Sequence, residues 1–347
     1  MVTRVIKDTA NTEAWQSQSL TYDEFGRLTV RDILMDDAGR VVTFYDAAGT
    51  QSWSRVVETY NATGQLISKA TSFDDGGRSV ARQDAGNTEA WTTFTTSYDA
   101  FGVRLRTDAL MDDGRLVTNH YDVGNAEAWE KMTVIQLNGQ TLSQARNFDD
   151  GTREVIQYDV AGTELWAYSA VTYDALGRVT TQGQVFDDGS SLRVVRDAAD
   201  ESAWSKISTW TSASGEVAQR SLYTDGGVHA GVQYDVDGSQ SWSVLGRIYG
   251  SDGKLAYAMQ ISDDLSYSEV LTGVAWRDVQ TVGGIVAHRA ADLEDGMVLT
   301  VDYDVTNDQS WLAYGKLTDA EGATLYSFTL NDDLSWSDQA ITNDWLA

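Results

Sequence analysis

The sequence predicts an all-β protein built as a tandem repeat array, and three observations support this prediction. Tryptophan recurs at an almost constant interval of 38 residues along most of the 347-residue chain. Between the tryptophans lie short runs rich in Val, Thr, Tyr and Phe, bounded by clusters of Gly, Asn and Asp, which is typical of strands and turns. No window sustains the 3.6-residue apolar period of an amphipathic helix. We therefore expect about nine units of 38 residues, each with three short strands.

Three markers keep the same register along the chain. The tryptophan marker comprises Trp15, Trp53, Trp91, Trp129, Trp166, Trp204, Trp242 and Trp311, and Trp276 continues the series at a shorter spacing. An Asp stands seven residues before eight of these nine tryptophans, whereas Glu269 takes that place before Trp276. A turn glycine recurs at Gly26, Gly64, Gly102, Gly139, Gly177, Gly215, Gly253 and Gly322. A fixed period of this length is the signature of a repeat architecture, in which stacked units bury a shared core.

One unit, residues 40–77, shows the order of the predicted elements. We expect strands over 40–45, 53–60 and 65–73, a polar loop over 46–52, and turns over 61–64 and 74–77. After Trp53, the apolar residues Val56 and Tyr60 are interspersed with the polar residues Arg55 and Thr59. This period of two predicts strands with one buried and one solvated face.

We expect a single array over residues 1–347 without separate domains. Its predicted units are 2–39, 40–77, 78–114, 115–151, 152–189, 190–227, 228–264, 265–296 and 297–333, followed by a C-terminal cap at 334–347. Short turns favour a coiled antiparallel sheet, in which hairpins add one after another. The alternatives are a three-sided β-solenoid with one unit per coil and, in third place, a propeller.

Composition excludes several classes of function. The chain has 25 Lys and Arg against 52 Asp and Glu, a net charge of −27, which argues against a nucleic-acid partner. It has no Cys, which excludes disulfides and thiolate sites, and no Pro. No apolar stretch reaches the length of a membrane span. The polar N-terminus predicts no signal peptide, and residues 334–347 resemble either an export signal or a capping strand.

Tyr-Asp turns give the chain a resemblance to a known family. The strings Tyr22-Asp23-Glu24-Phe25-Gly26-Arg27-Leu28 and Tyr173-Asp174-Ala175-Leu176-Gly177-Arg178-Val179 resemble the tyrosine–aspartate (YD) repeat of Rhs proteins and of the C component of insecticidal toxin complexes. The resemblance implies a β-sheet spiral that forms a hollow shell or a wall-associated surface protein. Because the 38-residue unit and its Trp marker differ from that family, only the sheet geometry is carried over. The acidic, Cys-free composition also resembles bacterial repeat proteins exported by type I secretion.

Paired acidic turns are the candidate metal site. They recur at Asp36, Asp37, Asp74, Asp75, Asp112, Asp113, Asp149, Asp150, Asp187 and Asp188. Stacked at one edge of the array, they would attract Ca²⁺, which takes six to eight oxygen ligands. The alternative is that Asp and Gly are turn formers on a solvated edge.

The recurring Trp has two interpretations. A column of stacked indoles inside the array, each N–H bonded to the loop Asp seven residues earlier, would be structural. An exposed row of indoles would bind sugars instead.

No catalytic motif recurs or stands out. The three histidines, His120, His229 and His288, occupy different phases of the repeat, and no nucleophile elbow or phosphate loop is present. We expect no enzyme; an active site would be sought where the repeat shortens, at 265–296.

These observations predict a non-enzymatic structural segment of a secreted or cell-surface bacterial protein, such as an adhesin, a matrix protein or a shell. We expect no cofactor other than Ca²⁺, and either a surface polysaccharide or other copies of the chain as partner. The alternatives are a carbohydrate-binding module that uses the Trp column and the shell of a toxin-like YD-repeat protein.

Overall fold

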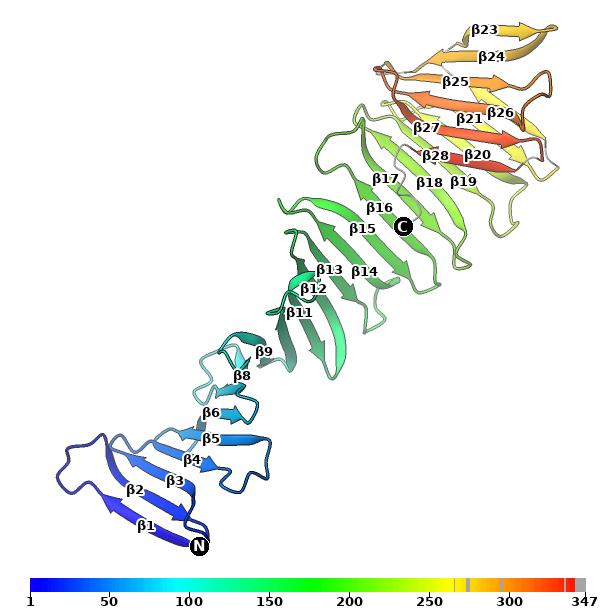
Figure 1. Cartoon of the computed structure of the whole chain (residues 1–347). Helices are drawn as coiled ribbons and strands as arrows, with labels where there is room; N and C mark the ends of the chain where they lie inside the picture. Colours follow the sequence, from blue (N-terminus) through cyan, green and yellow to red (C-terminus); the bar gives the residue numbers. More distant parts are fainter. Residues whose placement is uncertain (265, 273–274, 294–295, 334, 341–347) are drawn as a thin grey trace. The chain divides into compact units, whose positions relative to one another are not determined.

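The computed structural model describes residues 1–264, 266–272, 275–293, 296–333 and 335–340. These residues form 28 strands and no α-helix (Figure 1), so the predicted all-β class is confirmed. The chain divides into two compact units, Met1–Gly162 and Thr163–Ala347. We call them unit 1 and unit 2 and describe each by itself.

Unit 1 is one twisted antiparallel sheet in which each strand pairs with the next along the chain (Figure 1). Its strands are β1 (Val2–Lys7), β2 (Trp15–Tyr22), β3 (Leu28–Met35), β4 (Arg40–Tyr45), β5 (Trp53–Tyr60), β6 (Leu66–Phe73), β7 (Arg78–Gln83), β8 (Trp91–Tyr98), β9 (Arg104–Met111), β10 (Arg115–Tyr121), β11 (Trp129–Leu137), β12 (Gln140–Phe148) and β13 (Arg153–Tyr158).

Unit 2 contains two sheets. The first is β14 (Trp166–Tyr173), β15 (Val179–Phe186), β16 (Ser191–Arg196), β17 (Trp204–Thr211), β18 (Val217–Thr224), β19 (His229–Tyr234), β20 (Trp242–Tyr249), β21 (Leu255–Ser262) and β22 (Tyr267–Leu271). The second is six-stranded: β23 (Arg277–Val282), β24 (Ile285–Asp292), β25 (Val298–Tyr303), β26 (Trp311–Thr318), β27 (Thr324–Asn331) and β28 (Trp336–Ala340).

The described pairings are all antiparallel, and connections of two to seven residues join consecutive strands wherever the connection is fully described. This is the predicted hairpin-by-hairpin sheet. A β-solenoid would pair its coils in parallel, so that alternative is wrong. A set of three strands recurs, and the second strand of the set begins at the marker Trp. The predicted number of copies stays a prediction, and Glu294, Asp295 and most of the predicted cap at 334–347 lie outside the described residues.

The hairpin turns require a left-handed backbone at one residue, or at both residues of the two-residue turns Asn138-Gly139 and Gly283-Gly284. Gly64 has φ +80°, and Gly76, in an acidic turn, has φ +88°. A Cβ on Gly76 would stand 2.9 Å from the Cβ of Ala100, so glycine fits both the conformation and the space. Ala38 occupies the place equivalent to Gly76 with φ +65°, which is a strained conformation for alanine.

Equivalent residues of successive repeats lie on opposite faces of the sheet. Residues paired across strands share a face, and alternate residues of a strand change face. Val56 pairs across strands with Thr71, Thr71 with Ser79, and Ser79 with Ser97, so Val56 and Ser97 lie on the same face. Val56 follows Trp53 by three residues, whereas Ser97 follows Trp91 by six. Phe94, three residues after Trp91, therefore lies on the other face, where its ring centroid is 5.8 Å from that of Trp91. Three strands per repeat, an odd number, reverse both the strand direction and the face at each step.

The tryptophans therefore do not form a single stacked column. In unit 1, Trp15 and Trp91 belong to one face, and Trp53 and Trp129 belong to the other. Two tryptophans on the same face are six strands apart, about 29 Å at ~4.8 Å per strand, which is too far for rings to stack. The expected column is wrong for this reason.

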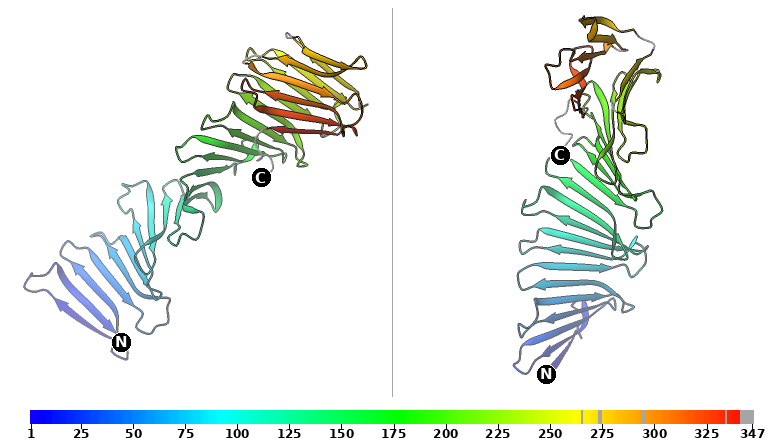
Figure 2. Two further views of the ribbon diagram at one scale, coloured as in Figure 1. Left: turned by 45° about the horizontal axis from the view of Figure 1, so that its top comes forward. Right: turned by 90° about the vertical axis from the view of Figure 1, so that its right-hand side faces the viewer.

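Unit 1 is a single layer, whereas unit 2 has a core between two layers. Most strand residues of unit 1 are half-exposed on both faces, and Val42 and Val56 are among the few that are buried. In unit 2 the six-stranded sheet, orange to red in Figure 2, packs on the yellow-green strands of the first sheet. Core residues come from both layers, for example Ile261 and Tyr257 from the first, and Leu299 and Leu317 from the second.

Candidate functional site: turns, polar clusters and faces

The acidic turns use their second Asp to organise the turn. The carboxylates of Asp75 and Asp188 accept the N–H groups of Gly77 and Ser190, each at 2.8 Å. The same bond recurs at Asp37, Asp113 and Asp150. The Ser190 hydroxyl and N–H, which stabilise the charged carboxylate, lower the pKa of Asp188.

The first Asp of each pair ties the turn to the loop that precedes the nearby Trp. The Asp74 N–H donates to the carbonyl of Ser52 at 3.2 Å, and the Asp36 N–H donates to the carbonyl of Ala14 at 3.3 Å. The equivalent bonds of Asp112, Asp149 and Asp187 are also present. The ten predicted metal-site residues thus lie in the turns, where the second Asp of each pair bonds within the turn and the first bonds to the loop.

Successive acidic turns lie at opposite edges of the sheet, because consecutive repeats run in opposite directions. Asp36 and Asp37 join β3 to β4 at one edge, whereas Asp74 and Asp75 join β6 to β7 at the other. Paired turns at the same edge are six strands apart, about 29 Å, so two of them cannot share an ion. The expectation of a single carboxylate column is wrong. Among the described residues, no group of three or more His, Asp or Glu side chains could hold a metal ion.

The Asp that precedes each Trp by seven residues closes its own loop. The Asp84 carboxylate accepts the Glu89 N–H at 2.8 Å, and this bond lowers the pKa of Asp84. Asp46 binds Gln51 N–H in the same way. Three residues after the Asp, a left-handed position is filled by Gly49 or Asn87, a regularity that sequence reasoning missed although Gly, Asn or Asp recurs there. The expected indole–Asp bond does not form at Trp204, whose buried Nε1 has no hydrogen-bond partner.

A β-bulge follows the marker Trp in every described strand pair that contains one. Trp53 pairs with Phe73 and Arg55 pairs with Ser72, which leaves Ser54 without an opposite residue. Its hydroxyl donates to the Ser72 carbonyl at 3.3 Å. A bulge bends the strand and increases its twist. Most marker tryptophans are followed by a polar residue, the only trace of the bulge in the sequence.

The Tyr-Asp-x-x-Gly-Arg strings fold into one kind of turn. Asp23 accepts the N–H groups of Phe25 and Arg27 at 2.9 and 2.8 Å, and its second oxygen pairs with the Arg27 guanidinium at 2.8 Å. Asp174 and Arg178 repeat the arrangement. These contacts explain why Asp, Gly and Arg occur at that spacing, since each residue serves the turn itself.

A cluster around Glu269 joins the two sheets of unit 2 where the repeat is irregular. The Glu269 carboxylate pairs with Arg289 and accepts the hydroxyls of Tyr303 at 2.6 Å and Tyr257 at 3.0 Å. Arg289 also stacks on Trp276, with the guanidinium 4.3 Å from the ring centroid. Burial raises the pKa of Tyr257, so its hydroxyl stays a neutral donor. The two departures from the repeat, Glu269 and Trp276, thus lie where the chain leaves the first sheet for the second.

A second polar contact between the sheets involves Asp338 of β28. Its carboxylate, 4% exposed, pairs with Arg220 at 2.5 Å and accepts the hydroxyls of Tyr234 at 2.8 Å and Tyr326 at 3.1 Å. Arg220 and Tyr234 belong to the first sheet, so both polar clusters fasten one layer to the other.

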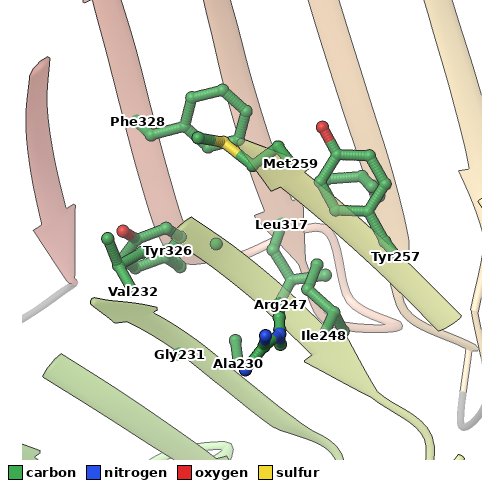
Figure 3. Close-up of a pocket in the computed structure, with 12 residues that line it drawn as sticks. Ala230, Gly231, Val232, Arg247, Ile248, Tyr257, Met259, Leu317, Tyr326 and Phe328 are labelled. Atoms are coloured by element: carbon green, nitrogen blue, oxygen red, sulfur yellow. The ribbon is translucent and has the colours of Figure 1, made fainter. Parts of the chain in front are cut away.

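The core of unit 2 borders an apolar pocket of about 20 Å³ (Figure 3). Its lining includes Tyr257 and Met259 from one sheet and Leu317 and Phe328 from the other. It is large enough for one water, but its surroundings supply too few polar partners to hold it. Beside the break at 265–296 lies a second pocket of about 250 Å³, in which the charged residues Asp252 and Lys254 pair with each other.

The three histidines lie apart in the fold. His120 is in β10 of unit 1. His229 is stacked between Tyr223 and Tyr249, with centroid distances of 4.3 and 5.6 Å, and burial lowers its pKa. His288 Nδ1 lies 2.5 Å from Asp302 Oδ1 on the neighbouring strand. None of the described bonds links one histidine to another.

Comparison with known proteins identifies no family. No family model matches the chain, and no curated protein matches it. No helix among the described residues has the length and apolarity to cross a bilayer.

Three solved structures are similar only weakly. The crystal structure of TcdB2-TccC3 is 12% identical, with a TM-score of 0.17 over 93% of this chain and 19% of that one. BamB from Moraxella catarrhalis is 10% identical, with a TM-score of 0.14 over 89% of this chain and 100% of that one. The β-propeller domain of Cps50 (Swd1) from Myceliophteria thermophila is 9% identical, with a TM-score of 0.11 over 98% and 100%. The chain thus spans about a fifth of the first of these proteins, and TM-scores this low carry no argument about function.

Proposed function

We propose that this chain is a non-enzymatic structural segment of a secreted or cell-surface bacterial protein, built from about nine copies of a 38-residue unit. The observation that carries the proposal is the single-layer sheet of unit 1, which repeats one three-strand set and leaves both faces half-exposed. An active site gathers unlike groups in a pocket, whereas here the same residue types recur from one 38-residue repeat to the next. Such a sheet offers extended surface for assembly and attachment, as an adhesin, matrix or shell segment requires.

The location of the protein tests this proposal directly. Antibodies raised against the purified chain are expected to label intact cells of its source organism, and protease added outside the cells is expected to destroy the signal. A protein found only in the cytosolic fraction would contradict the proposal. Export by a type I system predicts that the signal disappears from the surface when that exporter is deleted.

Calcium stabilisation is the second part of the proposal. In unit 2, Asp225 lies near the Trp-loop residues Asp197 and Asp200, and burial, followed by repulsion from these two carboxylates, raises its pKa. A cation bound between this turn and the loop, with backbone carbonyl oxygens completing its ligands, would relieve such repulsion. Thermal melts in EDTA and in millimolar CaCl₂, at matched ionic strength, are expected to show a higher midpoint with calcium. Equal midpoints would remove calcium from the account.

A toxin-like shell is the alternative that one observation favours. The Asp23–Arg27 and Asp174–Arg178 turns give the Tyr-Asp-x-x-Gly-Arg strings a structural role, which supports the resemblance to YD repeats. A shell predicts a hollow particle in electron micrographs of the full-length protein, whereas a stalk predicts a filled rod. The carbohydrate-binding alternative predicts quenching of Trp fluorescence by soluble polysaccharides.

A further inference from the structure

The strand cations of unit 1 are divided unequally between the two faces of the sheet. Four strand carboxylates lie on one face, and each is paired with a cation on that face: Asp32 with Arg40, Glu58 with Lys69, Asp108 with Arg106, and Glu154 with Arg146, at 2.7 to 3.4 Å. Consecutive cross-strand pairs connect Asp32, Glu58 and Asp108 across the sheet, which places them on one side. We call this side the paired face. Glu130, the remaining strand carboxylate of unit 1, is the extra residue of the bulge in β11.

The opposite side carries several cations for which the described contacts include no carboxylate, whereas Arg115 on the same side pairs with the turn residue Asp113. Arg55 pairs across strands with Ser72, Ser72 with Arg78, and Arg78 with Tyr98. Arg55 and Glu58 are three residues apart with no bulge between them, so they lie on opposite faces. The line continues from Tyr98 to Arg104, whose guanidinium lies 4.2 Å from the ring centroid of Tyr121.

The same line extends to the last strand of unit 1. Tyr121 pairs with Lys131, Lys131 with Asn147, and Asn147 with Arg153. The result is a basic row of Arg55, Arg78, Arg104, Lys131 and Arg153, on β5, β7, β9, β11 and β13. At about 4.8 Å per strand, its cations recur every ~10 Å over ~38 Å. Tyr, Ser and Asn side chains lie between the cations.

The basic row is accessible and makes few contacts within the chain. Arg55, Arg78, Arg104 and Arg153 are exposed, and Lys131 is half-buried. Apart from the stacking of Arg104 on Tyr121, no described ion pair or side-chain hydrogen bond engages these five cations. The acidic turns at the nearby edge weaken its field, but their carboxylates accept bonds within their own turns, as Asp75 does from Gly77 and Asp150 from Thr152. In a chain of net charge −27, a row of cations without carboxylate partners is not explained by the stability of the sheet.

We propose that the basic row of unit 1 binds a linear acidic polysaccharide laid across the strands. Guanidinium groups bind carboxylates and sulfates by charge-assisted, bidentate hydrogen bonds. The intervening tyrosines offer rings and hydroxyls to sugar. A spacing of ~10 Å corresponds to about two pyranose rings, so every second carboxylate of a polyuronate can meet a cation of the row. A nucleic-acid strand carries a charge every ~3.4 Å, so most of its phosphates would stay unneutralised against the acidic chain.

The proposal names a partner for the scaffold proposed above, but its test uses the isolated chain and is independent of the protein's location. The probe is polygalacturonate at 20 mM NaCl, with neutral dextran and single-stranded DNA as the other arms. Polygalacturonate is expected to bind, dextran is not, and binding is expected to weaken steeply with added salt because the contacts are ionic.

A pair of triple variants separates the row from the overall charge. R55S/R78S/R104S removes three cations of the basic row, and R40S/K69S/R106S removes three cations of the paired face. Both change the net charge by the same amount. The first is expected to weaken polygalacturonate binding at least ~10-fold, since each exposed ion pair contributes a factor of up to about five; the second is expected to change it less than ~2-fold. Circular dichroism melts confirm that both variants are folded.

Three outcomes would overturn the proposal. Equal losses in the two variants would mean that only net charge matters. Tighter binding of single-stranded DNA than of polygalacturonate would identify a different partner. Self-association at low salt that R55S/R78S/R104S abolishes, without polysaccharide binding, would assign the row to a second copy of the chain.

Discussion

At the scale of single residues, glycine makes room in unit 2 for a large side chain on the neighbouring strand of the same sheet. A Cβ on Gly315 would lie 2.0 Å from the ring of Phe328, and a Cβ on Gly246 would lie 2.8 Å from the Cγ of Met259. Both glycines follow their marker Trp by four residues, and both face the core. Glycine inside a strand marks such a close approach. The sequence shows the two glycines, but only the packing shows their reason.

Gly315→Ala is expected to destabilise unit 2 by about 1–3 kcal/mol, the usual cost of an overpacked core, because the rigid Phe328 ring has to move. Gly246→Ala is the matched control. Its neighbour Met259 is flexible and yields more easily, so the loss should be smaller. Urea denaturation of both variants measures the difference. Equal stabilities for Gly315→Ala and the natural chain would show that Phe328 does not cover Gly315.

The loop carboxylates predict a dependence of stability on pH. The Glu89 N–H lowers the pKa of Asp84 below 3.8, so the folded state holds the charged form more strongly than the unfolded state does. That contribution is present above pH 3.8 and is lost as the pH falls through the lower pKa of the folded state. Asp84→Asn should therefore lower the melting temperature at pH 7, and its difference from the natural chain should shrink below pH 3.8.

Glu24→Gln is the control for the loss of charge, because Glu24 is exposed and makes no described hydrogen bond. It removes the same charge without removing a described hydrogen bond, so it should lower the melting temperature at pH 7 less than Asp84→Asn does. A difference between Asp84→Asn and the natural chain that stays the same at every pH would show that the loop bond does not stabilise the charged carboxylate.

At the scale of elements, the Glu269 cluster fastens β22 of the first sheet to β24 and β25 of the second. Its ion pair with Arg289 is largely removed from water, with side-chain exposures of 13% and 19%. Breaking a buried pair leaves an uncompensated charge, which costs far more than breaking an exposed one. The irregular repeat thus has a physical purpose, because it supplies the contacts that the fold-over needs.

Glu269→Gln is expected to destabilise unit 2 by about 3 kcal/mol. Hydrogen exchange should quicken in β22, β24 and β25 and stay unchanged in β4 to β9 of unit 1. Asp302→Asn removes the carboxylate of the more exposed His288 pair and should cost less than about 1 kcal/mol. Unchanged exchange in β24 after Glu269→Gln would show that the cluster does not hold the second sheet.

At the scale of the molecule, the sequence predicted local structure well and long-range structure poorly. Period-two runs and turn residues located the strands, and β5 at Trp53–Tyr60 matches its predicted range. Local patterns say nothing about which face a repeat presents, so the opposite placement of Trp53 and Trp91 was missed. The break at 265–296 was visible, but folding a second sheet over the first depends on distant partners such as Glu269 and Tyr303.

The candidate sites were predictable only in part for the same reason. The acidic turns were located by their residues, yet their alternation between edges follows from strand direction. The basic row could not be read from the sequence at all, because Arg55, Arg78 and Arg104 come from different strand positions in the repeat. They align only when the sheet's register, including its bulges, is known.

The central claim is that successive three-strand repeats run antiparallel to one another. Equivalent residues of neighbouring repeats therefore lie on opposite faces of the sheet and near opposite edges, where the strands end. Because the chain has no native Cys, spin labels on Arg55→Cys/Thr93→Cys, two equivalent positions, can test it by electron paramagnetic resonance. The structure predicts about 22 Å between the two Cα atoms, because the positions are three strands apart across the sheet and five residues apart along the strand. For Arg55→Cys/Arg78→Cys, which lie two strands apart on one face, it predicts about 10 Å. A Cα separation near ~5 Å for positions 55 and 93 would mean that equivalent residues stack in register, and it would contradict the account.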